Sequence, residues 1–140
     1  MTSFADYRVS LLAIALLLVV VFVQWLVSSG RKAREEGAIP GTPPKTQDHH
    51  NFTFRAWRTH QNTLENLGTM LGASFLAILA GASPLVVAWL SWIMVLARVI
   101  HMVLFYAIAT NKNPSPRSYF FMLAWLANIA LLVVAISAIL

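Results

Sequence analysis

The chain has 140 residues, of which 59% are hydrophobic and 11% are charged, whereas soluble domains contain about 45–50% and about 25% of these classes. This composition excludes a soluble globular domain and a disordered chain. The absence of cysteine excludes disulfides, cysteine nucleophiles and cysteine-ligated metal sites. We therefore expect an integral membrane protein whose net charge of +5 lies in cytoplasmic loops and does not serve nucleic-acid binding.

Four segments predict four membrane-spanning helices, because a span needs about 20 predominantly apolar residues. The first is too long for the apolar region of a typical cleaved signal peptide, so we expect it to be an anchor. A turn separates the second and third spans, and in it Ser83 is the expected N-cap and Pro84 the first helical residue. The expected spans cover about residues 7–29, 53–80, 85–110 and 116–139.

Residues 1–140 are thus expected to form a single domain, an all-α bundle of four transmembrane helices with up-down topology. Its long loop, residues 30–51, is irregular and basic, and the loop before the fourth span carries Lys112. The positive-inside rule then places both termini outside and these two loops in the cytoplasm. His49 and His50 lie at the end of the long loop, where adjacent histidines are usually solvated, and we expect no metal site.

The second predicted span begins with a polar segment. At about 3.6 residues per turn, Arg58, Asn62 and Glu65 lie on one stripe of the helix, with Arg55 beside it. The third span carries Arg98 at nearly the same distance from the hairpin turn as Glu65. Because an unpaired charge inside a membrane costs about 3 kcal/mol or more, we expect an ion pair between Glu65 and Arg98.

Two further polar features point to the same end of the bundle. His101 shares a helix face with Arg98, and the fourth span begins with Ser115 as the expected N-cap. The amides of Arg117 and Ser118 are then expected to be unpaired, and a helix N-terminus with an arginine can bind an anion or a thiolate. Each residue alone could serve packing or reach lipid headgroups, but together they predict a binding site.

The segment Arg55-Ala-Trp-Arg58-Thr-His-Gln-Asn62-Thr-Leu-Glu65-Asn resembles the signature R-x-x-R-A-H-x-N-x-x-E-N of the membrane-associated eicosanoid and glutathione metabolism (MAPEG) family. Arg98 with His101, and Arg117 with Ser118, match further positions of the family in the same order. The resemblance covers essentially residues 5–140, and the chain is most similar in kind to the microsomal glutathione transferases of that family.

The resemblance implies a homotrimer with a cytosol-facing glutathione site between neighbouring subunits. Glutathione is implied as a co-substrate, and no metal is implied. The family tyrosine expected four residues after His101 is replaced by Phe105, with Tyr106 next to it. The residues expected to bind glutathione are Arg55, Arg58, Asn62, Glu65, Arg98, His101 and Tyr106. The expected catalytic residues are Arg117, which would stabilise the glutathione thiolate, and Ser118.

The expected function is a membrane-bound glutathione transferase, with glutathione-dependent peroxidase activity as an extension. Its second substrate would be a lipophilic electrophile or a lipid hydroperoxide drawn from the membrane lipid. One alternative is a non-catalytic relative that binds glutathione or lipid, which the replacement at Phe105 supports. Another is a channel or proton-coupled transporter, but no ionisable residue lies between Asn66 and Ala97 to continue a polar route. No retrieval signal follows Leu140, so we expect a bacterial inner membrane.

Overall fold

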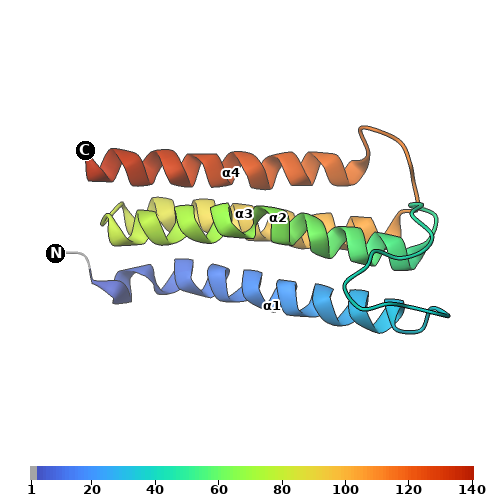
Figure 1. Ribbon diagram of the computed structural model, residues 1–140. Coiled ribbons are helices and arrows are strands. Elements are labelled where there is room, and N and C mark those ends of the chain that lie inside the picture. The colour runs from blue at the N-terminus through green and yellow to red at the C-terminus, as the bar shows by residue number, and fades with distance from the viewer. Residues whose placement is uncertain (1–2) are drawn as a thin grey trace.

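The computed structural model describes residues 3–140 as four long helices that run up and down, preceded by one 3₁₀ turn (Figure 1). The helices α2 and α3 lie between α1 and α4, and the long loop and the α3–α4 connection lie at the end of the bundle opposite the N- and C-terminal ends (Figure 1). The elements are η1 (Phe4–Tyr7), α1 (Arg8–Lys32), α2 (Phe52–Leu79), α3 (Pro84–Ala107) and α4 (Pro116–Ile139).

This architecture confirms the predicted all-α, up-down fold. The third helix ends at Ala107, three residues earlier than predicted, because Ile108 already has an extended backbone with φ −108° and ψ 111°. Residues 108–115 then form the connection to α4. This connection contains two asparagines and a proline, Asn111, Asn113 and Pro114, and both residue types favour loops over helix.

Within residues 3–140, three helical segments are long and apolar enough to cross a membrane, so the protein is an integral membrane protein. They are Phe4–Lys32, Pro84–Ala107 and Pro116–Ile139. The helix α2 has 28 residues, but Arg55, Arg58 and Glu65 make its first half polar. The residues that predict a binding site thus also make α2 less apolar than the other three helices.

The α2–α3 turn is closed by a glycine with a left-handed backbone. Gly81 has φ +72°, a conformation that glycine adopts without steric cost. Its amide donates a hydrogen bond to the carbonyl oxygen of Ile78, and the amide of Ala82 donates to that of Ala77, each at 3.1 Å. These bonds satisfy carbonyl groups that the end of a helix leaves without intrahelical partners.

The start of α3 matches the prediction, with Ser83 as N-cap and Pro84 at the beginning of the helix. The chain ahead of α1 is tied to this turn, since the Tyr7 hydroxyl donates a hydrogen bond of 2.5 Å to the Ala82 carbonyl. The start of α1 is also joined to α3, through a hydrogen bond from Trp92 that is described below.

Small side chains allow the helices to pack closely. Close approach of backbones through small residues is the usual way in which membrane helices associate. Large apolar side chains cover much of the outward surface, where they can face lipid. The buried alanines are Ala13, Ala56, Ala73, Ala77, Ala82, Ala97, Ala124, Ala127 and Ala135.

Candidate functional site

A cavity of about 410 Å³ lies at the loop-bearing end of the bundle, between α2, α3 and the start of α4. Its volume falls within the range of about 300–1,000 Å³ that is typical of small-molecule sites. Four polar residues expected at the site meet here, and aromatic and loop residues complete the wall. The lining residues are Asn62, His101, Phe105, Asn113, Pro114, Arg117, Ser118, Phe121 and Met122.

Arg117 provides a buried cationic group with an unused donor. Its side chain is 8% exposed, and its Nη2 atom donates to the Thr110 carbonyl at 3.0 Å. The guanidinium carbon lies 4.0 Å from the centre of the Phe105 ring. The Nη1 atom is buried and has no hydrogen-bond partner among residues 3–140. Because a buried, unpaired donor is costly, Nη1 is well suited to an anionic ligand in the cavity.

The start of α4 has Ser115 as N-cap and Pro116 in the first turn, as predicted. The expectation of an unpaired Ser118 amide was wrong, because this amide donates to the Ser115 carbonyl at 2.8 Å. The Ser118 hydroxyl in turn accepts a hydrogen bond of 3.2 Å from the Ser115 amide. This reciprocal cap uses the Ser118 amide and hydroxyl, which would otherwise be available to bind a ligand. The side chain of Arg117 is therefore the main donor that this helix end presents to the cavity.

Arg98 lies next to the cavity and is only 2% exposed. Its Nη1 atom donates to Asn62 Oδ1 and its Nη2 atom donates to Thr63 Oγ1, each at 2.8 Å. The predicted Glu65–Arg98 ion pair was wrong, since two neutral oxygens of α2 take the Arg98 donors. Thr63 was missed by the sequence reasoning, because a threonine hydroxyl in a helix carries no pattern that indicates its partner.

Glu65 pairs instead with Arg58 on its own helix. The guanidinium and carboxylate form two parallel hydrogen bonds, of 2.9 Å between Nη1 and Oε1 and 3.2 Å between Nη2 and Oε2. The two side chains are 34% and 55% exposed and lie on an open face of α2. This contact confirms the prediction that Arg58 and Glu65, seven residues apart, lie on one stripe of the helix. Neither lines the cavity.

Arg55 and Tyr106 lie at a junction outside the cavity lining. Arg55 is 7% exposed, and its Nη1 atom donates to the carbonyls of His49 at 2.8 Å and His50 at 3.1 Å. Its Nη2 atom donates to the Tyr106 carbonyl at 3.3 Å. The Tyr106 ring packs edge-on against Phe52, with centroids 5.5 Å apart. This geometry holds the end of the long loop against α2 and α3.

His49 lies beside the site, against the lining residue Phe105, and the sequence reasoning missed it because it was expected to be solvated. Its ring centroid lies 5.1 Å from that of Phe54 and 5.6 Å from that of Phe105, and its Nδ1 atom is buried without a partner. Burial lowers the pKa of His49 and the charge of Arg117 lowers it further, while Asp48 opposes both effects. The ring is thus kept neutral beside the cationic group of the cavity. Among residues 3–140, no cluster of three or more histidine or carboxylate side chains could hold a metal ion.

Asp48 connects the two loops at this end. The amide of Asn111 donates to Asp48 Oδ1 at 3.2 Å, and the backbone amide of His50 donates to the same oxygen at 3.1 Å. The hydrogen bond from His50, followed by that from Asn111, lowers the pKa of Asp48 below its usual value of 3.8. The Asp48 carboxylate is therefore ionised at neutral pH, and it joins the long loop to the segment that precedes Arg117.

The arrangement can hold an anionic or thiolate group against Arg117, within a cavity walled partly by aromatic rings. Comparison with known families gives one match: the model of the MAPEG family matches residues 9–137. No curated protein and no solved structure matches the chain.

Proposed function

Because the chain belongs to the MAPEG family, we propose that it is a membrane-bound glutathione transferase. Glutathione has two carboxylates, an ammonium group and a thiol that is poorly ionised at neutral pH. The observation that carries the proposal is the buried, unpartnered Nη1 atom of Arg117 beside a cavity of suitable size. A guanidinium next to a helix N-terminus lowers the pKa of a neighbouring thiol and so favours its thiolate.

In the proposed reaction, Arg117 holds the glutathione sulfur as a thiolate and the thiol proton leaves to solvent. The thiolate attacks the electrophilic carbon of a lipophilic compound that enters from the bilayer. A carbon–sulfur bond forms, and the leaving group departs with its electron pair. The protein contributes positioning and charge stabilisation, while the nucleophile belongs to the substrate.

Lipid hydroperoxides form a second proposed substrate class. The thiolate attacks the peroxide, the oxygen–oxygen bond breaks and an alcohol is released. A second glutathione then completes the reduction, so that two glutathione molecules and one hydroperoxide give one disulfide, one alcohol and one water. Detoxification of reactive membrane compounds is the role that both activities would serve.

The proposed active unit is a homotrimer in which each subunit has four membrane-spanning helices. We propose association because the Arg58–Glu65 pair is exposed in the single subunit and a neighbouring subunit would bury it. This pair lies on an open face of α2, and charged groups that face lipid are costly. On the same helix, a Cβ atom added to Gly68 or Gly72 would meet no atom of residues 3–140 within 4 Å apart from the adjoining helix backbone. A neighbouring subunit can approach closely at such glycines.

A site between subunits gives the remaining arginines their roles. From the covered face, Arg58 can bind a glutathione carboxylate through two hydrogen bonds, and Glu65 can accept the ammonium group. Arg98 positions Asn62, which lines the cavity. The loop-bearing end is the basic one, so the proposed orientation places this site in the cytoplasm of a bacterial inner membrane and both termini outside.

The proposal is tested with Arg117→Ala in the detergent-purified protein. Glutathione is titrated while thiolate absorbance and proton release are followed. Loss of a charge-assisted hydrogen bond costs about 1.5–3 kcal/mol, so the thiolate population should fall about 10- to 100-fold. The matched control is Arg34→Ala, which removes an exposed arginine of the long loop and should leave the signal unchanged.

Phe105 supports the alternative of a non-catalytic glutathione-binding relative. Its ring lies directly against the Arg117 guanidinium and offers no hydroxyl group to a ligand. If the unmodified protein binds glutathione without a thiolate signal or proton release, this alternative is correct and the transferase proposal is wrong. Absence of glutathione binding would contradict both.

A further inference from the structure

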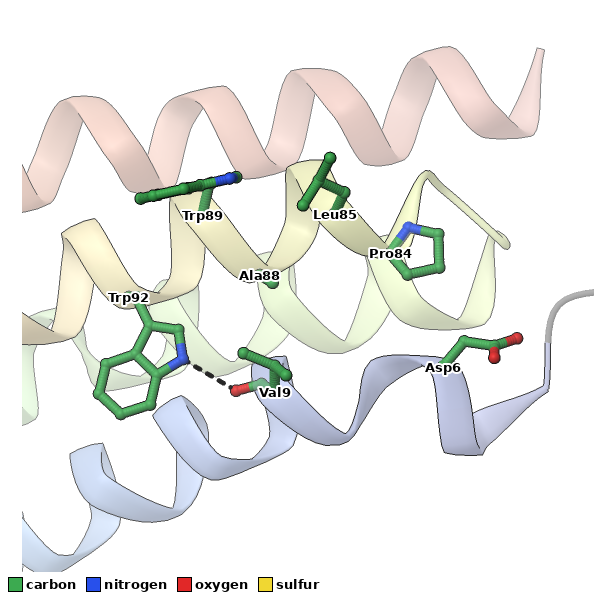
Figure 2. A pocket seen from close by; sticks show the side chains of 7 residues that line it. All are labelled: Asp6, Val9, Pro84, Leu85, Ala88, Trp89 and Trp92. Atoms are coloured by element: carbon green, nitrogen blue, oxygen red, sulfur yellow. Dashed lines mark hydrogen bonds between the residues drawn. The ribbon is translucent and has the colours of Figure 1, made fainter.

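A second cavity, of about 470 Å³, lies at the end of the bundle that carries the termini and the α2–α3 turn. It is formed between the start of α1 and the start of α3 (Figure 2). Its lining is apolar except for one carboxylate, and it includes two indole rings. The lining residues are Asp6, Val9, Pro84, Leu85, Ala88, Trp89 and Trp92.

The cavity has one acidic end and one aromatic end. Figure 2 shows Asp6 near Pro84 at the end of the helices, and Trp92 about two turns further along α3. This distance along the helix is about 12 Å, at about 1.5 Å per residue. The indole nitrogen of Trp92 donates to the Val9 carbonyl at 3.0 Å, so this wall is held in place. In a membrane, the acidic end would lie at the surface and the aromatic end within the hydrocarbon.

The one charged group that lines the cavity, the Asp6 carboxylate, complements a cationic ammonium group. Asp6 accepts a hydrogen bond of 2.8 Å from the Ser3 amide through Oδ2, which holds the carboxylate at the mouth of the cavity. Arg8 follows two residues later and its side chain is exposed. Within residues 3–140, these are the charged side chains at this end of the bundle. An ammonium group in this cavity would find a carboxylate to which it can donate.

We propose that this cavity binds a phospholipid with a primary ammonium headgroup, phosphatidylethanolamine. The ammonium group donates to Asp6, and one acyl chain follows Leu85 and Ala88 to the indole of Trp92. A quaternary ammonium headgroup has no N–H to donate to Asp6, and an anionic headgroup is repelled by it. The proposal is independent of the glutathione chemistry at the opposite end.

The experiment is a lipid titration of the purified full-length protein without glutathione. Bound lipids are counted by native mass spectrometry, using phosphatidylethanolamine, phosphatidylcholine and phosphatidylglycerol with the same acyl chains. An exposed ion pair contributes at most about 1 kcal/mol, so we expect phosphatidylethanolamine to be retained about three- to fivefold better than the other two. Equal retention of the three lipids, or preference for either of the others, would overturn the proposal.

Two variants assign the binding to this cavity. Asp6→Asn should abolish the preference for phosphatidylethanolamine, whereas Glu36→Gln, the same change on the exposed loop at the other end, should leave it intact. Ala88→Phe places a ring in the cavity and should reduce retention of the bound lipid, and an unchanged thermal unfolding curve would show that the variant is folded. If Asp6→Asn keeps the preference, or Ala88→Phe keeps the lipid, the proposed site is wrong. A change in oligomer mass with Ala88→Phe would show that another copy of the chain occupies the groove, and would also overturn it.

Discussion

Four arginines surround the polar end of the bundle, and their hydrogen-bond partners separate their roles. Arg55 donates to backbone carbonyls of the long loop and α3, and Arg98 donates to two side-chain oxygens of α2. Arg58 is paired with Glu65. Arg117 alone of these four both lines the cavity and keeps a terminal guanidinium nitrogen without a partner. Substitution of Arg55 or Arg98 should therefore act mainly on stability, and substitution of Arg117 on ligand chemistry.

His49 is predicted to report on the charge of the cavity. Its pKa is lowered first by burial and then by Arg117, so we expect the ring to titrate below its usual value of 6.5. Because the unfolded chain binds this proton more readily than the folded one, the His49 contribution to stability is present above pH 6.5. It is lost as the pH falls from 6.5 through the lower folded pKa. Histidine NMR titration of the protein in nanodiscs measures this pKa.

The same titration in Arg117→Ala tests the cause of the His49 shift. Removal of the positive charge should raise the pKa of His49 towards 6.5, while Arg34→Ala should not change it. A His49→Gln variant identifies the resonance and should reduce the acid-dependent loss of stability below pH 6.5 by the His49 contribution. A pKa of 6.5 or higher in the unmodified protein would contradict the buried position of the ring.

At the scale of secondary-structure elements, the helix ends are set by local chemistry. Prolines at the first turns of α3 and α4 have no amide that a helix start would leave unpaired, and serine is the N-cap of both helices. Asn51 caps α2, where its side chain accepts from the amides of Thr53 and Phe54. These signals are contained in a few consecutive residues, which is why the starts of these helices were predictable.

Gly81→Ala tests the α2–α3 turn. A left-handed backbone costs an alanine about 1–2 kcal/mol, so the variant should unfold a few degrees below the unmodified protein in a thermal scan. Gly81→Asn is the matched control, because asparagine tolerates this conformation better, and its loss should be smaller. Equal stability of the alanine variant and the unmodified protein would show that the turn can change its backbone without cost.

At the scale of the whole molecule, the open face of α2 determines how copies of the chain can associate. Three features lie on this helix: the exposed Arg58–Glu65 pair, and the two glycines at which added side chains would meet open space. Lipid cannot satisfy the charged pair, whereas a second protein surface can supply hydrogen-bond partners. The proposed active unit therefore contains more than one copy of the chain.

Gly72→Leu is expected to disrupt the proposed trimer, because the larger side chain keeps the neighbouring subunit at a distance. Native mass spectrometry should then give the mass of one 15.5-kDa chain where the unmodified protein gives three. Gly30→Leu is the matched control, since Gly30 also faces open space but lies near the end of α1. A trimer that survives Gly72→Leu, or a monomeric unmodified protein, would contradict association through this face.

Much of the fold could be read from residues close together in the sequence. Long apolar segments predicted the membrane class, and the Gly81–Pro84 turn divided α2 from α3 as expected. The stripe on α2 was also predictable, because helical periodicity places Arg58 and Glu65 on one face. The convergence of Asn62, His101 and Arg117 followed from helix ends that meet at one end of an up-down bundle.

Only the tertiary structure decided which groups those charges contact. The sequence predicts Glu65 and Arg98 at a similar depth, but depth does not determine the rotation of one helix against another, and Asn62 and Thr63 accept the Arg98 donors instead. His49 is half-buried because it packs against rings from α2 and α3, Phe54 and Phe105, which no pattern within the loop reveals. Helix position, caps and periodicity depend on neighbouring residues along the chain. Side-chain pairing depends on which donors and acceptors the other helices bring within reach, so it required the packed molecule.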